Sequence, residues 1–474
     1  MIEVKIDVFF NPRGVAVVGA SDKKGNPNNQ IFKYSKEVSL NGKVFPVNPK
    51  AESIEGVKAF KSLIDIPEPV DLIVMAVGSK SAIAIANDIK KRREIRGDAG
   101  AVVIVSAGFK EVGTKEAIDL QDEMISIMKL SGARVIGPNC QGVVDLYHGI
   151  NTTFSVPPDT AKGGVSIISQ SGAFATSFLR WAKEHKLVGV NKFVTLGNMA
   201  DVDVTEILEF MGNDEKTKVI SLYLEGTKNA RSLIETAKKV SAKKPIVAIK
   251  AGRTSLGSNV AHSHTASIAG DDSVYDGAFL QAGILRTNSI AEFYHSSRAF
   301  DKMPIPKGNR ICLLTVVGGP STICVDALVA SGEVQLAHLN DELKKKIKNI
   351  LTPSANVGNP DGYIDMTASV NPSMHKEILS LLMNDDTIDG ILFLTTPPGF
   401  ISDDDMAQAI IEGYNSVSDE KKKPLLSVFM AGNDVARCRR TLEENNLPTF
   451  EYSDDAARVM LNMVRYSQYL QRNK

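Results

Sequence analysis

The chain has 474 residues, of which 43% are hydrophobic and 23% charged, and its 55 basic residues balance its 55 acidic residues. This composition is that of a globular protein and excludes the disordered and fibrous classes. A net charge of zero also argues against nucleic acid or a membrane surface as a partner, because either would require a concentrated basic face.

The length suits about three domains of ~150 residues each. Cys140, Cys312, Cys324 and Cys438 lie far apart and form no C-x-x-C pair, so the sequence indicates neither a zinc site nor a disulfide framework. The start, MIEVKIDVFF, does not have the pattern of a signal peptide, and no stretch approaches the ~20 apolar residues of a membrane span. We therefore expect a cytoplasmic protein.

Residues 1–150 alternate short apolar, β-branched runs with helical patterns. Runs of this kind predict parallel strands covered by helices on both faces, and right-handed crossovers then give a doubly wound, Rossmann-like domain. The polar segment 150–164 contains two prolines and marks the first domain boundary. The strand candidates are VAVVGA, VFPVNP, VDLIVMAV, AGAVVIVSAG and ARVIGPN.

The same pattern recurs twice, which predicts two more doubly wound domains at 151–302 and 303–474. A linker, DKMPIPKGNR, separates them. The predicted fold class is therefore α/β with three parallel-sheet domains. The strand candidates are VSIISQSG, NKFVTLGN, KVISLYLEG and KPIVAIKAGRT, then ICLLTVVGGP, GILFLTTPP and KPLLSVFMAG.

Ligands of an open parallel sheet bind beyond the carboxyl ends of its strands, where helix N-termini offer free N–H groups. Small residues at these ends let a ligand approach the backbone closely. A NAD-binding unit would show G-x-G-x-x-G here and an acidic residue closing the second strand. The candidate residues in the first domain are Gly19, Ala20, Ser21, Asp22, Ser106, Ala107, Gly108 and Asn139.

The second strand is followed by Asn-Pro-Lys and not by an acidic residue. A cation at this place can pair with a phosphorylated ribose, so Lys50 favours coenzyme A, with its 3′-phosphate, over NAD. A solvated surface lysine is the alternative interpretation.

In the second domain, SQSGA lies between a predicted strand and a predicted helix. Ser171 at the helix start, followed by Gly172 and Ala173, leaves N–H groups free to hold an anion such as phosphate. An ordinary serine N-cap is the alternative.

A predicted long loop at 252–270 holds His262 and His264. No carboxylate or cysteine accompanies them at metal-ligand spacing, so we predict no metal site. A nucleophilic imidazole needs one nitrogen free and the other oriented by an acceptor. Glu225, at the end of the apolar run VISLYLEG, is the candidate acceptor, although a strand-end glutamate can also simply face water.

The ordered set of these motifs resembles that of the α subunits of archaeal ADP-forming acetyl-CoA synthetases. In chain order the motifs are the GAS loop, the GPN turn, SQSG, TLGN, YLEG and GRT followed by SHT. These synthetases are relatives of succinyl-CoA synthetase. The resemblance covers nearly the whole chain and implies a Rossmann-like CoA-binding domain followed by two flavodoxin-like domains. The implied reaction is acid + ATP + CoA ⇌ acyl-CoA + ADP + phosphate, through an acyl phosphate and a phosphohistidine.

The motif match implies a role for each candidate residue. His264 would carry the phosphoryl group and Glu225 would stabilise it, while Thr176 and Asn198 would contact the acid. The first-domain residues named above, with Lys50, would hold CoA. The phosphate would be held by Ser171, Gly172, Ala173 and Ser263.

Two features depart from the family pattern. Ala266 follows SHT where the family often has glycine, which would restrict the backbone if that position needs a positive φ. The first loop continues as GNPNNQ and lacks a further glycine.

The family binds its nucleotide in an ATP-grasp module, and none follows Lys474. The resemblance therefore implies a partner that supplies ADP or ATP and Mg²⁺. This partner would be a separate β subunit, in an α2β2 assembly, or the remainder of a fused chain. His264 would then lie at the junction or swing between two sites.

Other interpretations predict different residues. A non-catalytic CoA-sensing or scaffold module predicts loss of the histidine and the glutamate, and both are present. An NAD-dependent oxidoreductase would show the missing glycine fingerprint, and a citrate-cleaving lyase would need a further domain. The sequence does not distinguish between acetate, other short acids and hydroxy acids such as 3-hydroxypropionate or 4-hydroxybutyrate as the substrate. It also does not indicate the direction of the reaction or the role of His262.

Overall fold

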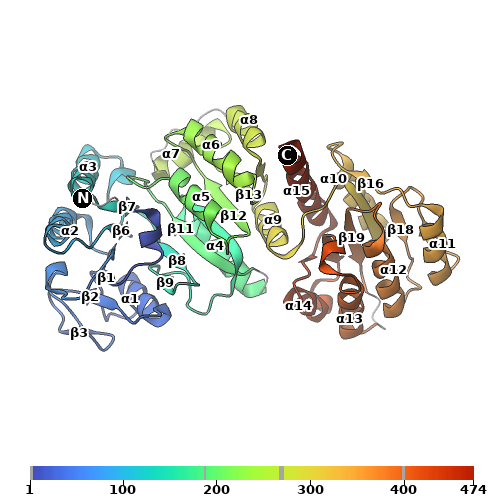
Figure 1. Ribbon diagram of the computed structural model, residues 1–474, viewed down its shortest axis with the longest axis horizontal. Helices are drawn as coiled ribbons and strands as arrows, with labels where there is room; N and C mark the ends of the chain where they lie inside the picture. The colour runs from blue at the N-terminus through green and yellow to red at the C-terminus, as the bar shows by residue number, and fades with distance from the viewer. Residues whose placement is uncertain (1–3, 186–187, 266–271, 398–400, 474) are drawn as a thin grey trace. The chain divides into compact units, whose positions relative to one another are not determined.

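The computed structural model describes residues 4–185, 188–265, 272–397 and 401–473, and for 184–185 and 261–265 it describes the backbone alone. The chain divides into two compact units (Figure 1). Unit 1 comprises Met1–Lys183 and Gly189–Arg286, and unit 2 comprises Glu184–Val188 and Thr287–Lys474. Within the described ranges, no helix is long and apolar enough to cross a membrane.

The first sheet of unit 1 has five parallel strands in the order β2-β1-β5-β6-β7. The apolar runs of the sequence become its strands because both faces are covered, and β1, β5 and β6 are buried along their whole length. The elements are β1 (Val15–Val18), α1 (Pro27–Val38), β2 (Val44–Val47), β5 (Leu72–Met75), α2 (Ala82–Arg96), β6 (Ala101–Ile104), η4 (Lys110–Val112), α3 (Lys115–Leu130) and β7 (Arg134–Ile136), with a small hairpin of β3 (Ser53–Ile54) and β4 (Val57–Lys58).

The second sheet of unit 1 has the order β14-β13-β12-β10-β11-β8-β9. Its strands run parallel except at one edge, where β8 pairs antiparallel with both β11 and β9. This edge begins at Val143, inside the range predicted as the first domain. The elements are β8 (Val143–Asp145), β9 (Ile150–Asn151), β10 (Lys162–Ser169), α4 (Gly172–His185), β11 (Val190–Thr195), α5 (Val204–Asn213), β12 (Val219–Leu224), α6 (Ala230–Ser241), β13 (Ile246–Lys250), α7 (Ser255–Thr265), α8 (Asp272–Ala282) and β14 (Ile284–Arg286).

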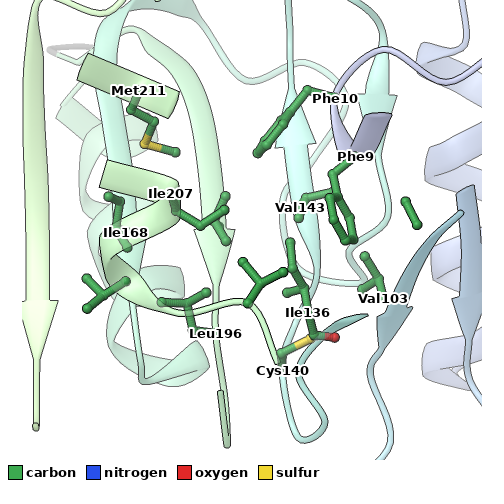
Figure 2. Close-up of a cluster of buried hydrophobic side chains, with 14 of the residues drawn as sticks. Phe9, Phe10, Val103, Ile136, Cys140, Val143, Ile168, Leu196, Ile207 and Met211 are labelled. Carbon is green, nitrogen blue, oxygen red and sulfur yellow. The ribbon is translucent and has the colours of Figure 1, made fainter. Parts of the chain in front are cut away.

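The two sheets of unit 1 share one hydrophobic core. Figure 2 shows Phe9 and Ile136, from the side of the first sheet, beside Val143 and Leu196 of the second. The rings of Phe10 and Phe210 also stack, with centroids 4.7 Å apart. Since interiors of this kind are close-packed and hardly compressible, the strand ends of the two sheets hold fixed positions relative to each other.

Unit 2 contains a third sheet in the order β17-β18-β15-β19-β20-β21, with β16 also paired to β15. Only β17 and β18 pair antiparallel among the described strands of this sheet. The helix α9, which lies within the predicted second domain, packs on α15 in this unit, where Asn462 Nδ2 donates to Glu292 Oε1 at 2.9 Å. The elements are α9 (Ile290–Lys302), β15 (Arg310–Thr315), α10 (Gly318–Val329), β16 (Gln335–Leu336), α11 (Asp341–Ile350), β17 (Asn356–Val357), β18 (Tyr363–Asp365), α12 (Pro372–Asn384), β19 (Gly390–Thr395), α13 (Asp403–Tyr414), β20 (Leu425–Phe429), α14 (Ala436–Glu444), β21 (Thr449–Phe450) and α15 (Ser453–Arg472).

The predicted fold class, α/β with parallel sheets, is confirmed by these three sheets. One local prediction is wrong, because the segment expected as a long loop at 252–270 is helical over Ser255–Thr265. The hydroxyl of Thr254 accepts the N–H of Gly257 at 3.0 Å and so caps the first turn of this helix.

Candidate functional site

The turn between β10 and α4 is shaped by its serine side chains. Ser169 Oγ donates to the carbonyl oxygen of Ser171 at 2.6 Å and accepts the N–H of the same residue at 3.1 Å. Ser171 Oγ accepts the N–H of Phe174 at 3.3 Å, as an N-cap does. A Cβ atom on Gly172 would lie 2.7 Å from the side chain of Gln141. The helix N-terminus is therefore closely packed, with Ala173 exposed at its first turn.

Glu225 lies directly after β12 and is 5% exposed. Tyr223, two residues earlier and therefore on the same face of the strand, donates its hydroxyl to Glu225 Oε1 at 3.3 Å. Burial, and then the charge of Glu225, raise the pKa of Tyr223, so its hydroxyl stays protonated as a donor. Glu225 Oε2 has no hydrogen-bond partner among the described residues.

Gln170 links this glutamate to the serine turn. Its Oε1 accepts the backbone N–H of Glu225 at 2.5 Å and that of Gly226 at 3.1 Å. Its own N–H donates to the carbonyl oxygen of Tyr223 at 3.3 Å. The predicted phosphate turn and the predicted glutamate are thus adjacent, because β10 and β12 are neighbouring strands.

The topology also brings the histidine helix to this edge. β13 pairs with β12 on the side opposite β10, in a register that places Lys250 beside Leu224. Four residues separate β13 from the start of α7, which contains Ser263 and His264. The side chains of Ser263 and His264 lie outside the described part of the chain, as does the side chain of His262, and Ala266 lies outside the described residues altogether.

Thr176 lies one turn into α4 and its hydroxyl is engaged within the protein. It donates to Gln141 Oε1 at 2.6 Å, and Ser155 Oγ donates to the same oxygen. The backbone N–H of Gln141 in turn donates to Thr195 Oγ1 at 2.6 Å. Gln141 therefore joins the turn that follows β7 to the first turn of α4.

Asn198 follows β11 and reaches the first sheet. Its Nδ2 donates to Glu111 Oε2 at 2.6 Å and to Gln121 Oε1 at 2.9 Å, while Oδ1 has no partner among the described residues. Glu111 Oε1 accepts the N–H groups of Gly108 at 2.6 Å and Phe109 at 3.1 Å. Asn198 thus fixes the loop that follows β6, and only its carbonyl oxygen remains available to a ligand.

The loop after β1 is held by its own side chains. Gly19 has φ +88°, and a Cβ atom there would lie 2.6 Å from the carbonyl oxygen of Ala76, so only glycine fits this turn. The carbonyl oxygen of Ala20 accepts from Asn48 Nδ2 at 2.9 Å. Ser21 Oγ accepts the N–H of Lys23 at 3.1 Å, and Asp22 Oδ1 accepts that of Glu55.

The other candidates of the first sheet lie at the same carboxyl edge. The N–H of Asn139 donates to the carbonyl oxygen of Ser106 at 2.9 Å, which joins the loops after β6 and β7. Ala107 and Lys50 are exposed, and Gly108 has φ +100°. The carboxyl edge of this sheet is therefore lined by small residues, and the exposed Lys50 follows the neighbouring strand β2.

The sequence missed four residues of this site, namely Gln141, Gln170, Tyr223 and Glu111. Gln170 and Tyr223 are contained in the quoted motifs SQSG and YLEG, so their position was a signal that residue type alone did not reveal. Gln141 lies two residues beyond the GPN turn. No group of three or more His, Cys, Asp or Glu residues suited to a metal ion occurs in the described ranges.

Comparison with family profiles assigns residues 13–145 to a CoA binding domain. Residues 162–300 match a succinyl-CoA ligase like flavodoxin domain. The first match contains all five strands of the first sheet, and the second contains β10 to β14 of the second sheet and continues into α9.

Known proteins resemble the whole chain. The α subunit of acetate–CoA ligase [ADP-forming] II from Pyrococcus furiosus is 37% identical over 468 residues, 98% of each chain. The acetate–CoA ligase [ADP-forming] of Methanocaldococcus jannaschii is 36% identical over 96% of this chain, which spans 62% of that longer protein. The structure of Ca. Korarchaeum cryptofilum acetyl-coenzyme A synthetase 1 with phosphate and ADP superposes with a TM-score of 0.90 at 31% identity, covering 99% of both chains.

Proposed function

The chain belongs to the family of ADP-forming acetate–CoA ligase α subunits, and from this premise we propose that it is the CoA-binding and phosphoryl-carrying subunit of such a ligase. The proposed reaction is acid + ATP + CoA ⇌ acyl-CoA + ADP + phosphate, with acetate or another short acid as substrate. The observation that carries the proposal is the buried carboxylate of Glu225, which keeps one oxygen unpartnered among the described residues beside the N-terminus of α4.

A buried carboxylate is costly unless a donor pairs with it. Tyr223 satisfies Oε1 only. The chain that leaves β13 next to Glu225 continues into α7 with His264. We propose that the imidazole donates one N–H to Glu225 Oε2, which leaves the other nitrogen unprotonated and nucleophilic.

In the direction that consumes acyl-CoA, inorganic phosphate displaces CoA from the acyl group and yields an acyl phosphate and free CoA. The imidazole of His264 then attacks the phosphorus, the bond from phosphorus to the acyl oxygen breaks, and the acid leaves as a carboxylate. ADP finally takes the phosphoryl group from the nitrogen. The N–H of Ser171 is already donated to Ser169 Oγ. The N–H groups of Gly172 and Ala173, with the positive end of the α4 dipole, would stabilise the phosphoryl charge in each step.

Coenzyme A would bind at the open edge of the first sheet. Gly19 and Gly108, both with positive φ, keep the backbone of their loops free of side chains where the ligand would approach. The exposed Lys50 would pair with its 3′-phosphate. The loop that contains Gly108 leads into η4, a neighbour of α7, so the reactive end of CoA would lie near the histidine helix.

The partner is part of the proposal. The Pyrococcus relative is named as a subunit, and the Methanocaldococcus relative is longer than this chain. We infer an ATP-grasp chain, separate in an α2β2 assembly or fused, that binds ADP or ATP with Mg²⁺. The metal would neutralise the nucleotide phosphates during transfer to and from His264.

The test is reconstitution. The chain is mixed with its candidate ATP-grasp partner, CoA, ATP and a panel of short acids, and both ADP and the CoA thioester are measured. We expect stoichiometric release of ADP and formation of thioester with at least one acid. CoA binding without turnover for every acid would instead support the CoA-sensing module.

A further inference from the structure

In the side chain of Gln170, the oxygen Oε1 is hydrogen-bonded to described residues and the nitrogen Nε2 is not. The side chain is 3% exposed, and Oε1 accepts two backbone N–H groups, those of Glu225 and Gly226. Both partners are donors, so the atom that faces them must be the oxygen and the orientation of the carboxamide is fixed. Nε2, a donor of two hydrogens, has no partner among the described residues.

A buried donor without an acceptor is costly, and native proteins keep few of them. This one lies between Ser169 and Ser171, in the turn that opens α4, and its carboxamide touches the backbone of Glu225. The unpaired acceptor Glu225 Oε2 belongs to the same junction. A ligand that brings both an N–H donor and anionic oxygens would satisfy both atoms.

Phosphohistidine is such a ligand, because its ring offers one N–H and its phosphoryl group offers three acceptor oxygens. We propose that Gln170 Nε2 donates a hydrogen bond to a phosphoryl oxygen of phosphorylated His264. This inference rests on the proposed function and assigns to its site a side-chain donor in addition to the backbone N–H groups of α4.

The two halves of the carboxamide would then have separate tasks. Oε1 holds the end of β12 against the serine turn and thereby positions Glu225, a structural task that persists without phosphate. Nε2 acts only when the phosphoryl group is present, so it would stabilise the phosphorylated state and the transition state that leads to it.

Substitution separates these tasks. Gln170→Glu keeps an oxygen for the two N–H groups but replaces the donor with an anionic oxygen. With the holoenzyme and [γ-³²P]ATP, we expect histidine phosphorylation to slow by about 100-fold, the size seen when one such donor is lost, while the KM for CoA stays at the wild-type value. Tm should fall, because the new carboxylate is buried and lies beside Glu225. Gln408→Glu, on the exposed face of α13, is the matched control and should leave the rate unchanged.

Phosphorylation of Gln170→Glu at the wild-type rate would overturn the inference and leave the proposed function intact. An absence of phosphohistidine in the wild-type holoenzyme would overturn both. If Gln170→Glu does not fold, a crystal structure of the phosphorylated wild-type holoenzyme decides. A distance of about 3.2 Å or less from Nε2 to a phosphoryl oxygen supports the inference, and a distance above about 4 Å refutes it.

Discussion

Replacing Glu225 by glutamine removes the charge that the proposal assigns to this buried site and keeps the size of the side chain. The amide oxygen can still accept from Tyr223, as Oε1 does at 3.3 Å. The amide nitrogen then occupies the place of Oε2, the atom without a partner among the described residues. In the proposed complex this nitrogen faces the imidazole N–H, so two donors oppose each other.

The cost has two parts. Loss of a hydrogen bond to a charged group costs about 1.5–3 kcal/mol, and a buried unsatisfied donor costs a further ~1–3 kcal/mol. The lower limits together give about 2.5 kcal/mol, and since ~1.36 kcal/mol corresponds to tenfold in rate, phosphorylation should slow by at least about 70-fold. The free energy of unfolding should not fall, because an amide is cheaper to bury than an unpaired carboxylate.

The assay is single-turnover labelling of the holoenzyme with [γ-³²P]ATP, combined with a thermal melt. Glu235→Gln, on the exposed surface of α6, is the matched control and should match the wild type in both measurements. Labelling of Glu225→Gln at the wild-type rate would refute the role of the carboxylate. A lower Tm with normal labelling would show that Glu225 acts on stability alone.

Three further outcomes are expected. Lys50→Ala should raise the KM for CoA about tenfold, because a charge-assisted contact is lost, but leave the KM for dephospho-CoA unchanged. Lys61→Ala is the control. Equal effects of Lys50→Ala on the KM for CoA and on the KM for dephospho-CoA would contradict a 3′-phosphate contact. Gly197→Ala should lower Tm more than Gly97→Ala. Both glycines have positive φ, so alanine is strained at either position. Only at Gly197 would the new Cβ atom also meet a neighbour, the carbonyl oxygen of Pro138 at 2.2 Å. In thiol titration at pH 8, the native chain should show no fast-reacting cysteine. All four cysteines are buried, and burial raises the pKa of each thiol to about 12. Rapid reaction of one thiol per chain would contradict that burial.

The central parallel strands of each sheet were predictable, because strands covered on both faces appear in a sequence as continuous apolar runs. The short strands toward the sheet edges, such as β8, β14 and β18, have only three residues each and were not among the predicted strands. The helix at Ser255–Thr265 was not, since small and polar residues dominate it and its start depends on a cap from Thr254. A stretch of small and polar residues favours a loop prediction, and a single capping hydroxyl is only a weak sequence signal for the start of a helix.

For the site, the sequence identified the turn of Ser171 and the strand end of Glu225, because both lie at the carboxyl edges where ligands of open sheets bind. It did not reveal what these residues contact. Asn198 pairs with Glu111, 87 residues away, and Thr176 with Gln141, 35 residues away. Such pairs follow from how strands order within a sheet, which no local pattern records. Gln170 stands in SQSG and Gln141 two residues after GPN, and neither residue type by itself indicates these contacts.

The most direct test of the account is the location of the phosphate. The holoenzyme is labelled with [γ-³²P]ATP, the labelled peptide is sequenced, and the stability of the label in acid and base is measured. We expect acid-labile, base-stable phosphate on His264 and its loss in His264→Asn. Full labelling of His264→Asn, or phosphate on another residue, would contradict it.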